Sequence, residues 1–183
     1  EFTKPLEWYP TEYDCYSVLK EWSALKPPPH PEQRCEIAKS VFEWIQNWSF
    51  HWKKGVMLSI DYGDVFPSLY DRRPYGTLRA YLMHQRLTGP DIYNNMGRQD
   101  ITADVNFSDL IHWGTQLGWT HAPLQTQREF IQKHAPGIFD RASTDPGLAF
   151  LIDPEGAGTA FKVLEQQREP GTETRRIRKL TVA

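Results

Sequence analysis

The chain has 183 residues, of which 21 are basic and 23 acidic, so its formal net charge is −2 at pH 7. This balance gives no reason to expect nucleic acid or an anionic membrane surface as a partner. No apolar run approaches the roughly 20 residues of a membrane-spanning helix. The length suits one domain or one piece of a larger one, and we expect an N-terminal arm and linker over 1–30, a folded part over 31–167 and a polar tail over 168–183.

The first predicted elements are a helix and a strand in immediate succession. Apolar residues recur at spacings of three and four from about residue 32 to residue 54, which predicts an amphipathic helix. Gly55 stands where a left-handed C-terminal cap would end that helix. The apolar run 56–60 that follows is typical of a buried strand. A helix followed by a buried strand favours an α/β fold.

The middle of the chain is predicted in less detail. Residues 64–107 show no convincing periodicity and contain several Pro and Gly, so they are either a long functional lid or binding loop or a segment whose elements the pattern does not identify. Ser108 is expected to cap a helix over 109–117, which Gly118 would end. A short strand is expected at 119–121.

The last third contains one strong helix signal and one strand. Thr126 and Glu129 form a capping-box pattern, so a helix is expected to begin there. The apolar run 148–152 fits either a helix or a strand. Residues 156–158 predict a turn, and 160–165 predict a strand.

The first candidate functional residues are Asp61 and Tyr62, at the end of the first predicted strand. In open α/β sheets, ligands bind at the carboxyl ends of the strands, so this position favours a functional role for Asp61. The six His residues are scattered without the spacing of metal ligands, and we predict no metal site. The sequence contains no Gly-rich phosphate loop and no nucleophile elbow.

Further polar residues follow in the predicted long loop: Arg79, His84, Asp100, Thr102 and Asp104. The two carboxylates can serve a site, or they can pair with arginines and hold the loop in place. The imidazole of His84 suits acid–base chemistry, and it suits a structural hydrogen bond equally well.

Five sequence blocks, in order, resemble motifs of the MidA-like S-adenosylmethionine-dependent methyltransferases, the family of the mitochondrial complex I assembly-factor arginine methyltransferase. They are the G-x-x-L-x-I-D-Y-G block at 55–63, the G-T-L-R block within 73–81, the D-I-T-A-x-V block within 97–107, the T-Q-x-x-F block at 126–130 and the G-x-x-F-K-V-L block at 158–164. The chain departs from the family at Asp104, where the family has His, and at Ala157, where it has Met.

The resemblance implies a fold. Class I, Rossmann-like methyltransferase sheets have the strand order 3-2-1-4-5-7-6, and the blocks correspond to the C-terminal half of such a sheet. The strand at 56–61 would be the fifth, one near 117–123 the sixth and one at 160–166 the seventh, with helices and a long inserted loop region. The edge of the fifth strand would then lack its neighbour. The family's Gly-rich cofactor loop and its N-E-x-x-D block have no counterpart in this sequence, so the cofactor-binding residues are unknown.

The resemblance also implies a function: a methyltransferase that uses S-adenosylmethionine and acts on a protein side chain such as that of arginine. The implied partners are a protein substrate and either the missing N-terminal half or another chain against the fifth strand. The implied compartment is the bacterial cytoplasm or, alternatively, the mitochondrial matrix. The chain alone is expected to be inactive, and the competing hypothesis is a non-catalytic interaction or assembly module. The site residues predicted in this way are Asp61, Tyr62 and His84 as catalytic residues, and Arg79, Asp100, Thr102 and Asp104 as substrate-binding residues.

Overall fold

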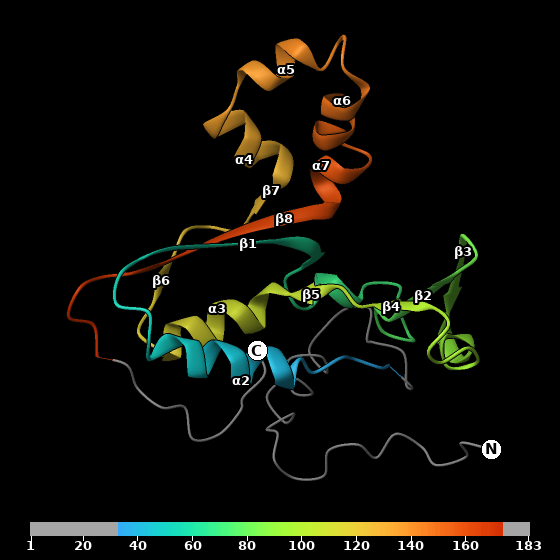
Figure 1. The fold of residues 1–183 in the computed structure, drawn as a ribbon, viewed down its shortest axis with the longest axis horizontal. Coiled ribbons are helices and arrows are strands. Elements are labelled where there is room, and N and C mark those ends of the chain that lie inside the picture. Colours follow the sequence, from blue (N-terminus) through green and yellow to red (C-terminus); the bar gives the residue numbers. More distant parts are fainter. Residues whose placement is uncertain (1–32, 174–183) are drawn as a thin grey trace.

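Two long antiparallel strands, β1 (Gly55–Asp64) and β8 (Phe161–Arg168), run side by side through the centre of the molecule (Figure 1). The structure is a computed structural model that describes residues 33–173. The remaining strands are short: β2 (Arg79–Leu82), β3 (Gln85–Thr88), β4 (Asp100–Thr102), β5 (Val105–Asn106), β6 (Thr120–His121) and β7 (Gln125–Thr126). The helices are α2 (Lys39–Ser49), α3 (Phe107–Gln116), α4 (Gln127–His134), α5 (Gly137–Arg141), α6 (Pro146–Ile152), α7 (Ala157–Ala160) and the 3-10 helices η1 (Ser68–Tyr70) and η2 (Gly89–Tyr93).

The strands form two separate sheets. The larger has the order β5-β1-β8-β6, with β7 also paired to β8, and only the β1–β5 pair is parallel. The smaller has the antiparallel order β3-β2-β4. The predicted neighbour order of the first, last and intermediate strands, β1-β8-β6, is confirmed. The fold is therefore mixed α/β, while the assignment of these strands as the fifth, seventh and sixth of a class I sheet stays a prediction.

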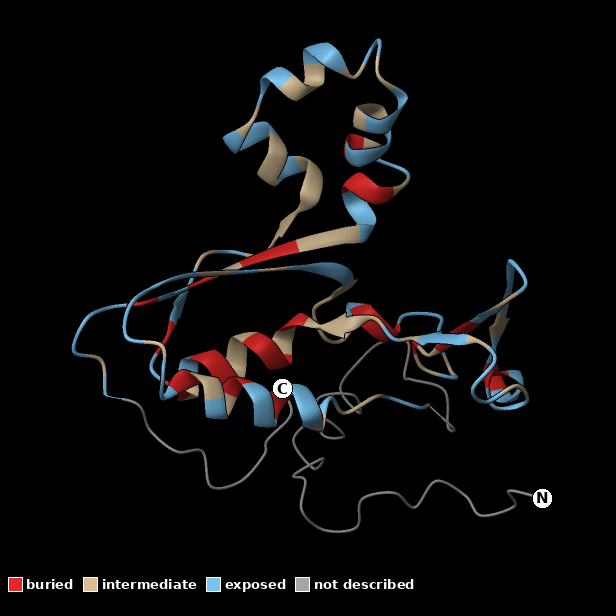
Figure 2. Cartoon of the chain, in the orientation of Figure 1, coloured by how far each residue is buried: buried red, intermediate tan, exposed pale blue. Residues whose placement is uncertain are grey.

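The main core lies between the larger sheet and the helices α2 and α3. Phe107, Trp113 and Leu117 from α3 and its C-terminal end are fully buried, as is Leu164 of β8. Figure 2 shows this burial as red segments along α3 and in β8. The helices α4 to α7 stand on the opposite side of β8 (Figure 1). Among residues 33–173, no helix combines the length and apolar character needed to cross a bilayer.

The prediction that β1 is a buried strand is wrong. Val56, Leu58 and Ile60 share one face of β1 and are 55%, 46% and 47% exposed. Met57, on the opposite face, packs against the main core. The apolar pattern of β1 therefore provides for burial on two faces, whereas the described residues cover only one.

The first predicted helix is shorter than its apolar periodicity indicated. It begins at Lys39 rather than near residue 32 and ends at Ser49, because the preceding residues form tertiary hydrogen bonds instead. The carboxylate of Glu36 accepts the backbone N–H groups of Thr77 and Leu78, at 2.8 and 3.2 Å. Gly55, at φ +131°, opens β1 instead of capping the helix.

Several local predictions are decided by hydrogen bonds. Asn106, not Ser108, caps α3: its side chain accepts the backbone N–H of Ser108 at 3.1 Å, whereas the Ser108 hydroxyl accepts the N–H of Phe66 at 2.9 Å. The capping box of Thr126 and Glu129 is confirmed at the start of α4.

Three other segments take forms that differ from the prediction or settle its alternatives. The run 148–152 is part of the helix α6, and the turn predicted at 156–158 is wrong for residues 157 and 158, which belong to α7. Residues 64–107 are not one long loop, since they contain the smaller sheet. The predicted arm over 1–30 lies outside the described residues, as does most of the predicted tail, although Arg168 ends β8 and is buried.

Candidate functional site

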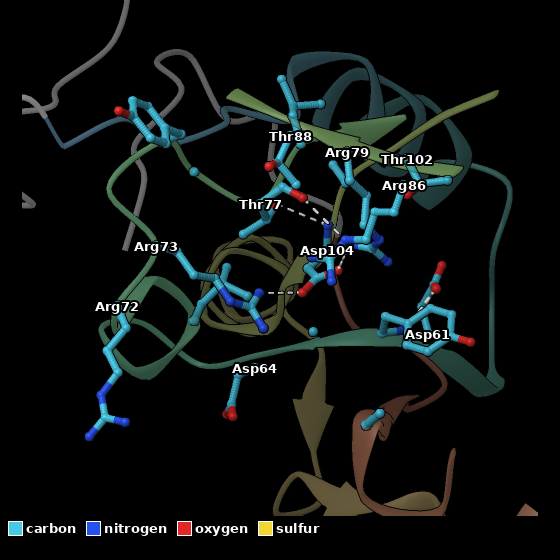
Figure 3. Close-up of a pocket in the computed structure, with 18 of the residues that line it drawn as sticks. Asp61, Asp64, Arg72, Arg73, Thr77, Arg79, Arg86, Thr88, Thr102 and Asp104 are labelled. Carbon is cyan, nitrogen blue, oxygen red and sulfur yellow. Dashed lines mark hydrogen bonds and ion pairs between the residues drawn. The ribbon is translucent and has the colours of Figure 1, made fainter. Parts of the chain in front are cut away.

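A cavity of about 1030 Å³ lies at the C-terminal end of β1. Its walls come from the last residues of β1, the loop that precedes β2, the smaller sheet, and the junction of α7 with β8. We call it the central cavity, and Figure 3 shows its lining. The polar residues at its surface that carry the argument below are Asp61, Asp64, Arg73, Thr77, Arg79, Tyr81, Arg86, Thr88, Thr102, Asp104 and Lys162.

Gly63 allows β1 and β5 to approach each other closely where they pair beside this cavity. Its Cα lies opposite that of Val105 in the parallel pair, and its φ is +158°. A Cβ atom at Gly63 would lie 2.1 Å from the carbonyl oxygen of Val105, closer than any packing tolerates. The close approach brings the loop before α3, which carries Asp104, to the end of β1.

Asp104 is the centre of a charged network on one side of the cavity. Its two carboxylate oxygens accept hydrogen bonds from the guanidinium groups of Arg73 and Arg79 (dashed lines, Figure 3). Its backbone N–H donates to the Thr77 hydroxyl at 3.0 Å, and that hydroxyl donates to Glu36 at 3.0 Å. This carboxylate therefore holds the loop and the smaller sheet in place, which is the structural alternative stated for Asp104.

Arg79 links this network to the end of β1. Its guanidinium is buried and also donates from Nε to the Tyr81 hydroxyl at 3.2 Å. Burial by itself lowers the pKa of Arg79, but the hydrogen bonds to Asp104 and Tyr81 outweigh burial and raise the pKa above its ordinary value. The guanidinium carbon lies 5.5 Å from the centre of the Tyr62 ring, within range of a cation–π contact. Tyr62 in turn packs on Phe161, with ring centroids 3.9 Å apart.

Asp61 differs from Asp104 in that its carboxylate has no cationic partner among the described residues. One oxygen accepts the backbone N–H of Tyr62 at 2.7 Å, and the side chain is exposed to the cavity. Lys162 lies opposite Asp61 in the β1–β8 register, but its ammonium group is directed to Asp64, at 3.8 Å, and to the carbonyl of Thr159, at 2.8 Å. Asp61 is thus a carboxylate available for a cationic ligand.

The structure brings most of the predicted site residues together, but not all. Asp61, Tyr62, Arg79, Thr102 and Asp104 all line the central cavity. His84 does not: it stands at the exposed tip of the β2–β3 hairpin, with φ +64°. Asp100, at the start of β4, is exposed and lies outside the lining. The roles proposed for these two residues stay predictions that the geometry does not support.

Other residues of the cavity were not predicted, above all Arg86 and Thr88 of β3. The sequence signal for the β2–β3 hairpin is weak, because 79–82 (Arg-Ala-Tyr-Leu) alternates only if Tyr counts as polar and 85–88 (Gln-Arg-Leu-Thr) does not alternate. The turn of the hairpin is Met83-His84, with φ values of +47° and +64°, and it lacks the Asn-Gly pattern that usually identifies such hairpins.

A second, mostly apolar groove of about 520 Å³ runs between β1 and the helices α2 and α3. Val41, Trp44, Ile60 and Trp113 are among its lining residues. We call it the apolar groove. It follows the same edge of β1 that β5 meets only at Gly63 and Asp64. Over the described residues, no cluster of His, Cys, Asp or Glu side chains is arranged to hold a metal ion.

Comparison with known proteins gives a family and a fold. The model of a family described as "putative S-adenosyl-L-methionine-dependent methyltransferase" matches residues 4–124. The fold resembles the crystal structure of an uncharacterised protein from Burkholderia thailandensis, with a TM-score of 0.62 and 26% identity over 78% of this chain. It also resembles a protein of the same superfamily from that organism bound to S-adenosyl-homocysteine, with a TM-score of 0.64 and 23% identity over 86% of this chain. The chain spans only 40% and 43% of these two structures, and no curated protein matches it.

Proposed function

The chain belongs to this family of S-adenosyl-L-methionine-dependent methyltransferases, and on that premise we propose that it forms the acceptor-binding part of a methyltransferase that modifies a protein side chain. The observation that carries the proposal is the contrast between two carboxylates of the central cavity. Asp104 accepts hydrogen bonds from two arginines, whereas Asp61, three residues before the end of β1, has no cationic partner among residues 33–173. A carboxylate in that state attracts a cationic side chain of a substrate.

The acceptor that best fits Asp61 is an arginine, in keeping with the MidA-like resemblance of the sequence. A carboxylate can hold a guanidinium through two parallel hydrogen bonds and fix its orientation. It can also take up the proton that the guanidinium loses when a methyl group is added. Tyr62, packed on Phe161, already lies within cation–π range of Arg79, so the substrate cation is assigned to the Asp61 carboxylate and not to this ring.

The cofactor of the family is S-adenosylmethionine, but the described residues do not provide a site for the whole molecule. Arg73, Arg79 and Arg86 line the central cavity and disfavour any cation that has no carboxylate partner. Asp61 is the one carboxylate of the cavity without a cationic partner among the described residues, and the acceptor would occupy it, so no carboxylate is left for a cationic sulfonium. We therefore derive no step through the cofactor from these residues. This chain would supply the acceptor side, and a further segment would supply the cofactor side.

Three features of β1 support a missing partner segment. Its outer face exposes Val56, Leu58 and Ile60, the apolar groove runs beside it, and most of one edge lacks a neighbouring strand among the described residues. An apolar sheet face of this kind normally packs against another layer. The solved structures with this fold are more than twice as long as the part that this chain covers. We infer that the partner is the cofactor-binding half of the methyltransferase, as part of the same polypeptide or as a second chain.

The test of the acceptor role is Asp61→Asn in the complete methyltransferase. Transfer of a labelled methyl group to protein should fall at least about tenfold, because the amide neither pairs with a guanidinium nor accepts its proton. Asp140→Asn on α5 is the matched control, since Asp140 is also exposed and lies far from the central cavity. Turnover that is equal in the Asp61 variant and the control would remove Asp61 from the mechanism.

A second candidate function is a non-catalytic assembly module, which the exposed apolar face of β1 favours. Calorimetry with S-adenosylmethionine on the 183-residue chain bears on both candidates. We expect no binding in the micromolar range by the chain alone, and restored binding once the cofactor half is added. Micromolar affinity of the isolated chain would contradict the proposed division of the site, and absence of binding in the reconstituted protein would favour the assembly module.

A further inference from the structure

One face of the smaller sheet forms a wall of the central cavity and is rich in hydrogen-bond donors. In the register of β2, β3 and β4, Arg79 lies opposite Thr88 on one side and Thr102 on the other, and Tyr81 lies opposite Arg86. Residues that face each other across antiparallel strands project to the same side of a sheet. All five of these residues line the central cavity, so this face, with its two guanidinium groups and three hydroxyls, points into it.

The cationic charge of this wall exceeds what the described residues neutralise. Asp104 is the single carboxylate that pairs with both Arg73 and Arg79. Arg86, diagonally across from Arg79, has no hydrogen-bond or ion-pair partner within the described part of the chain, and Figure 3 shows its side chain extending beside that of Arg79. Two guanidinium groups at such positions repel each other, and a bound anion relieves that repulsion.

Thr102 adds an independent observation. Its hydroxyl oxygen has almost no accessible surface and no hydrogen-bond partner. A buried hydroxyl without a partner is uncommon, because its desolvation is not compensated. This hydroxyl lies beside Arg79 in the register and at the cavity wall. Because this oxygen is closed off from solvent, the side chain must turn about its Cα–Cβ bond before the hydroxyl can donate to a group with acceptor oxygens in the cavity, and that bond would complete its hydrogen bonding.

We propose that this wall binds an oxyanion, a carboxylate or a phosphate monoester carried by a side chain of the polypeptide substrate, through Arg86 and the hydroxyls of Thr102 and Thr88. The inference rests on the proposed function in one respect, that the central cavity receives the methyl acceptor. The substrate would then present a cationic acceptor to Asp61 and an acidic or phosphorylated residue to Arg86. Asp61 and Asp64, on the β1 side of the cavity, would repel a continuous polyanion, so the wall fits one isolated anionic group rather than nucleic acid.

The test is a binding titration without cofactor, so its outcome does not depend on methyl transfer. Three blocked pentapeptides serve as probes: acetyl-Gly-Gly-Glu-Gly-Gly-amide, the phosphoserine equivalent and the neutral Gln equivalent. Shifts of the backbone and arginine Nε–H resonances of the isotopically labelled chain report binding. We expect one or both anionic peptides to shift resonances of β2, β3 and β4, and the Gln peptide to leave them unchanged. Which of the two anionic peptides binds more tightly identifies the side chain.

Three variants assign the binding to this wall. Arg86→Gln should weaken the affinity about tenfold, the usual effect of losing a charge-assisted hydrogen bond. Thr102→Val should weaken it a few-fold while leaving the unfolding midpoint unchanged or higher, because the valine removes an unpartnered buried hydroxyl. Arg98→Gln, an exposed arginine outside the cavity, is the control and should bind as the unaltered chain does.

Two results would overturn the proposal. One is the absence of shifts with both anionic peptides at tens of millimolar, and the other is equal affinity in the Arg86 and Arg98 variants. Either result would leave the Asp61→Asn experiment unaffected, so a failed oxyanion site is distinguishable from a failed methyltransferase assignment.

Discussion

The larger and the smaller sheet are held in place by different interactions. The larger sheet packs on α2 and α3 through fully buried apolar side chains such as Phe107, Trp113 and Leu164. The smaller sheet is held by the polar groups of Glu36, Thr77 and Asp104, most of them at the wall of a cavity. Apolar packing is insensitive to direction, whereas charged hydrogen bonds fix distances and angles. The main core therefore stabilises the larger sheet without fixing exact geometry, whereas the polar contacts of the smaller sheet fix the geometry of the central cavity.

The largest effect on the free energy of unfolding should come from a residue of the main core. Trp113 is fully buried and packs edge-to-face on Phe42, with ring centroids 5.3 Å apart. Trp113→Ala should lower the free energy of unfolding by about 3–5 kcal/mol, the range for large aromatic truncations in a core. Denaturant unfolding followed by circular dichroism measures this loss. The control is Trp44→Ala on the exposed side of α2, where we expect a much smaller loss. A loss below about 1 kcal/mol for Trp113 would show that the core tolerates the cavity.

A smaller effect, confined to the other sheet, should follow from Asp104→Asn. The change leaves the buried guanidinium of Arg79 without its charged partner, which should cost about 2–3 kcal/mol, less than in a fully buried pair because Arg73 is partly exposed. Hydrogen exchange should accelerate in β2 and β4 while the amides of α3 stay protected.

The matched control for Asp104 is Asp100→Asn, since Asp100 is an exposed carboxylate of the same sheet. Equal loss of hydrogen-exchange protection in both sheets after Asp104→Asn would show that the smaller sheet is not stabilised separately from the main core. Uniform loss is instead what we expect of Trp113→Ala.

The smallest effect should come from the capping box of α4, outside both regions. Thr126→Ala should cost about 1 kcal/mol, because it removes the N-cap hydroxyl that accepts the N–H of Glu129. Hydrogen bonds from the backbone and hydroxyl of Thr126 lower the pKa of the Glu129 carboxyl. A carboxyl with a lowered folded-state pKa stabilises the protein above its unfolded pKa, and this contribution disappears as the pH falls through the folded value.

The difference in stability between the unaltered chain and Thr126→Ala should therefore be constant near neutral pH and shrink below about pH 4. Unfolding measured at several pH values gives this difference directly. A difference that stays the same down to pH 2 would show that the charge of Glu129 contributes nothing to the cap.

Local signals explain which parts of the fold could be predicted from the sequence. The capping box of α4 and the strand order β1-β8-β6 came from a short-range pattern and from family-like blocks. The length of α2 could not be predicted, because Glu36 is withdrawn from the helix by partners 41 and 42 residues away. The exposure of β1 could not be predicted either. An apolar run indicates that a strand can be buried, but it does not indicate which segments pack against that strand.

The residues of the central cavity show the same difference between local sequence signals and long-range contacts. Asp61 and Tyr62 could be predicted because the C-terminal part of a strand is a local feature with a topological meaning, although β1 continues beyond the predicted end to Asp64. Arg86 was missed because its hairpin turns through Met83 and His84, which are unusual at positive φ. His84 was placed in the site by its neighbourhood in the sequence, and the hairpin carries it to the far tip.

The open edge of β1 also decides how the isolated chain behaves in concentrated solution. The segment from Val56 to Ile60 contains no charge and no proline, and its alternate side chains are already exposed. Natural sheets protect such edges with lysines, bulges or covering segments, and none of the described residues protects this one. An edge of this kind favours pairing between copies of the chain as its concentration rises, so the titrations and unfolding measurements belong at low protein concentration. Under the proposed function, the cofactor-binding half would cover β1 as well as complete the binding site, and it would suppress this pairing.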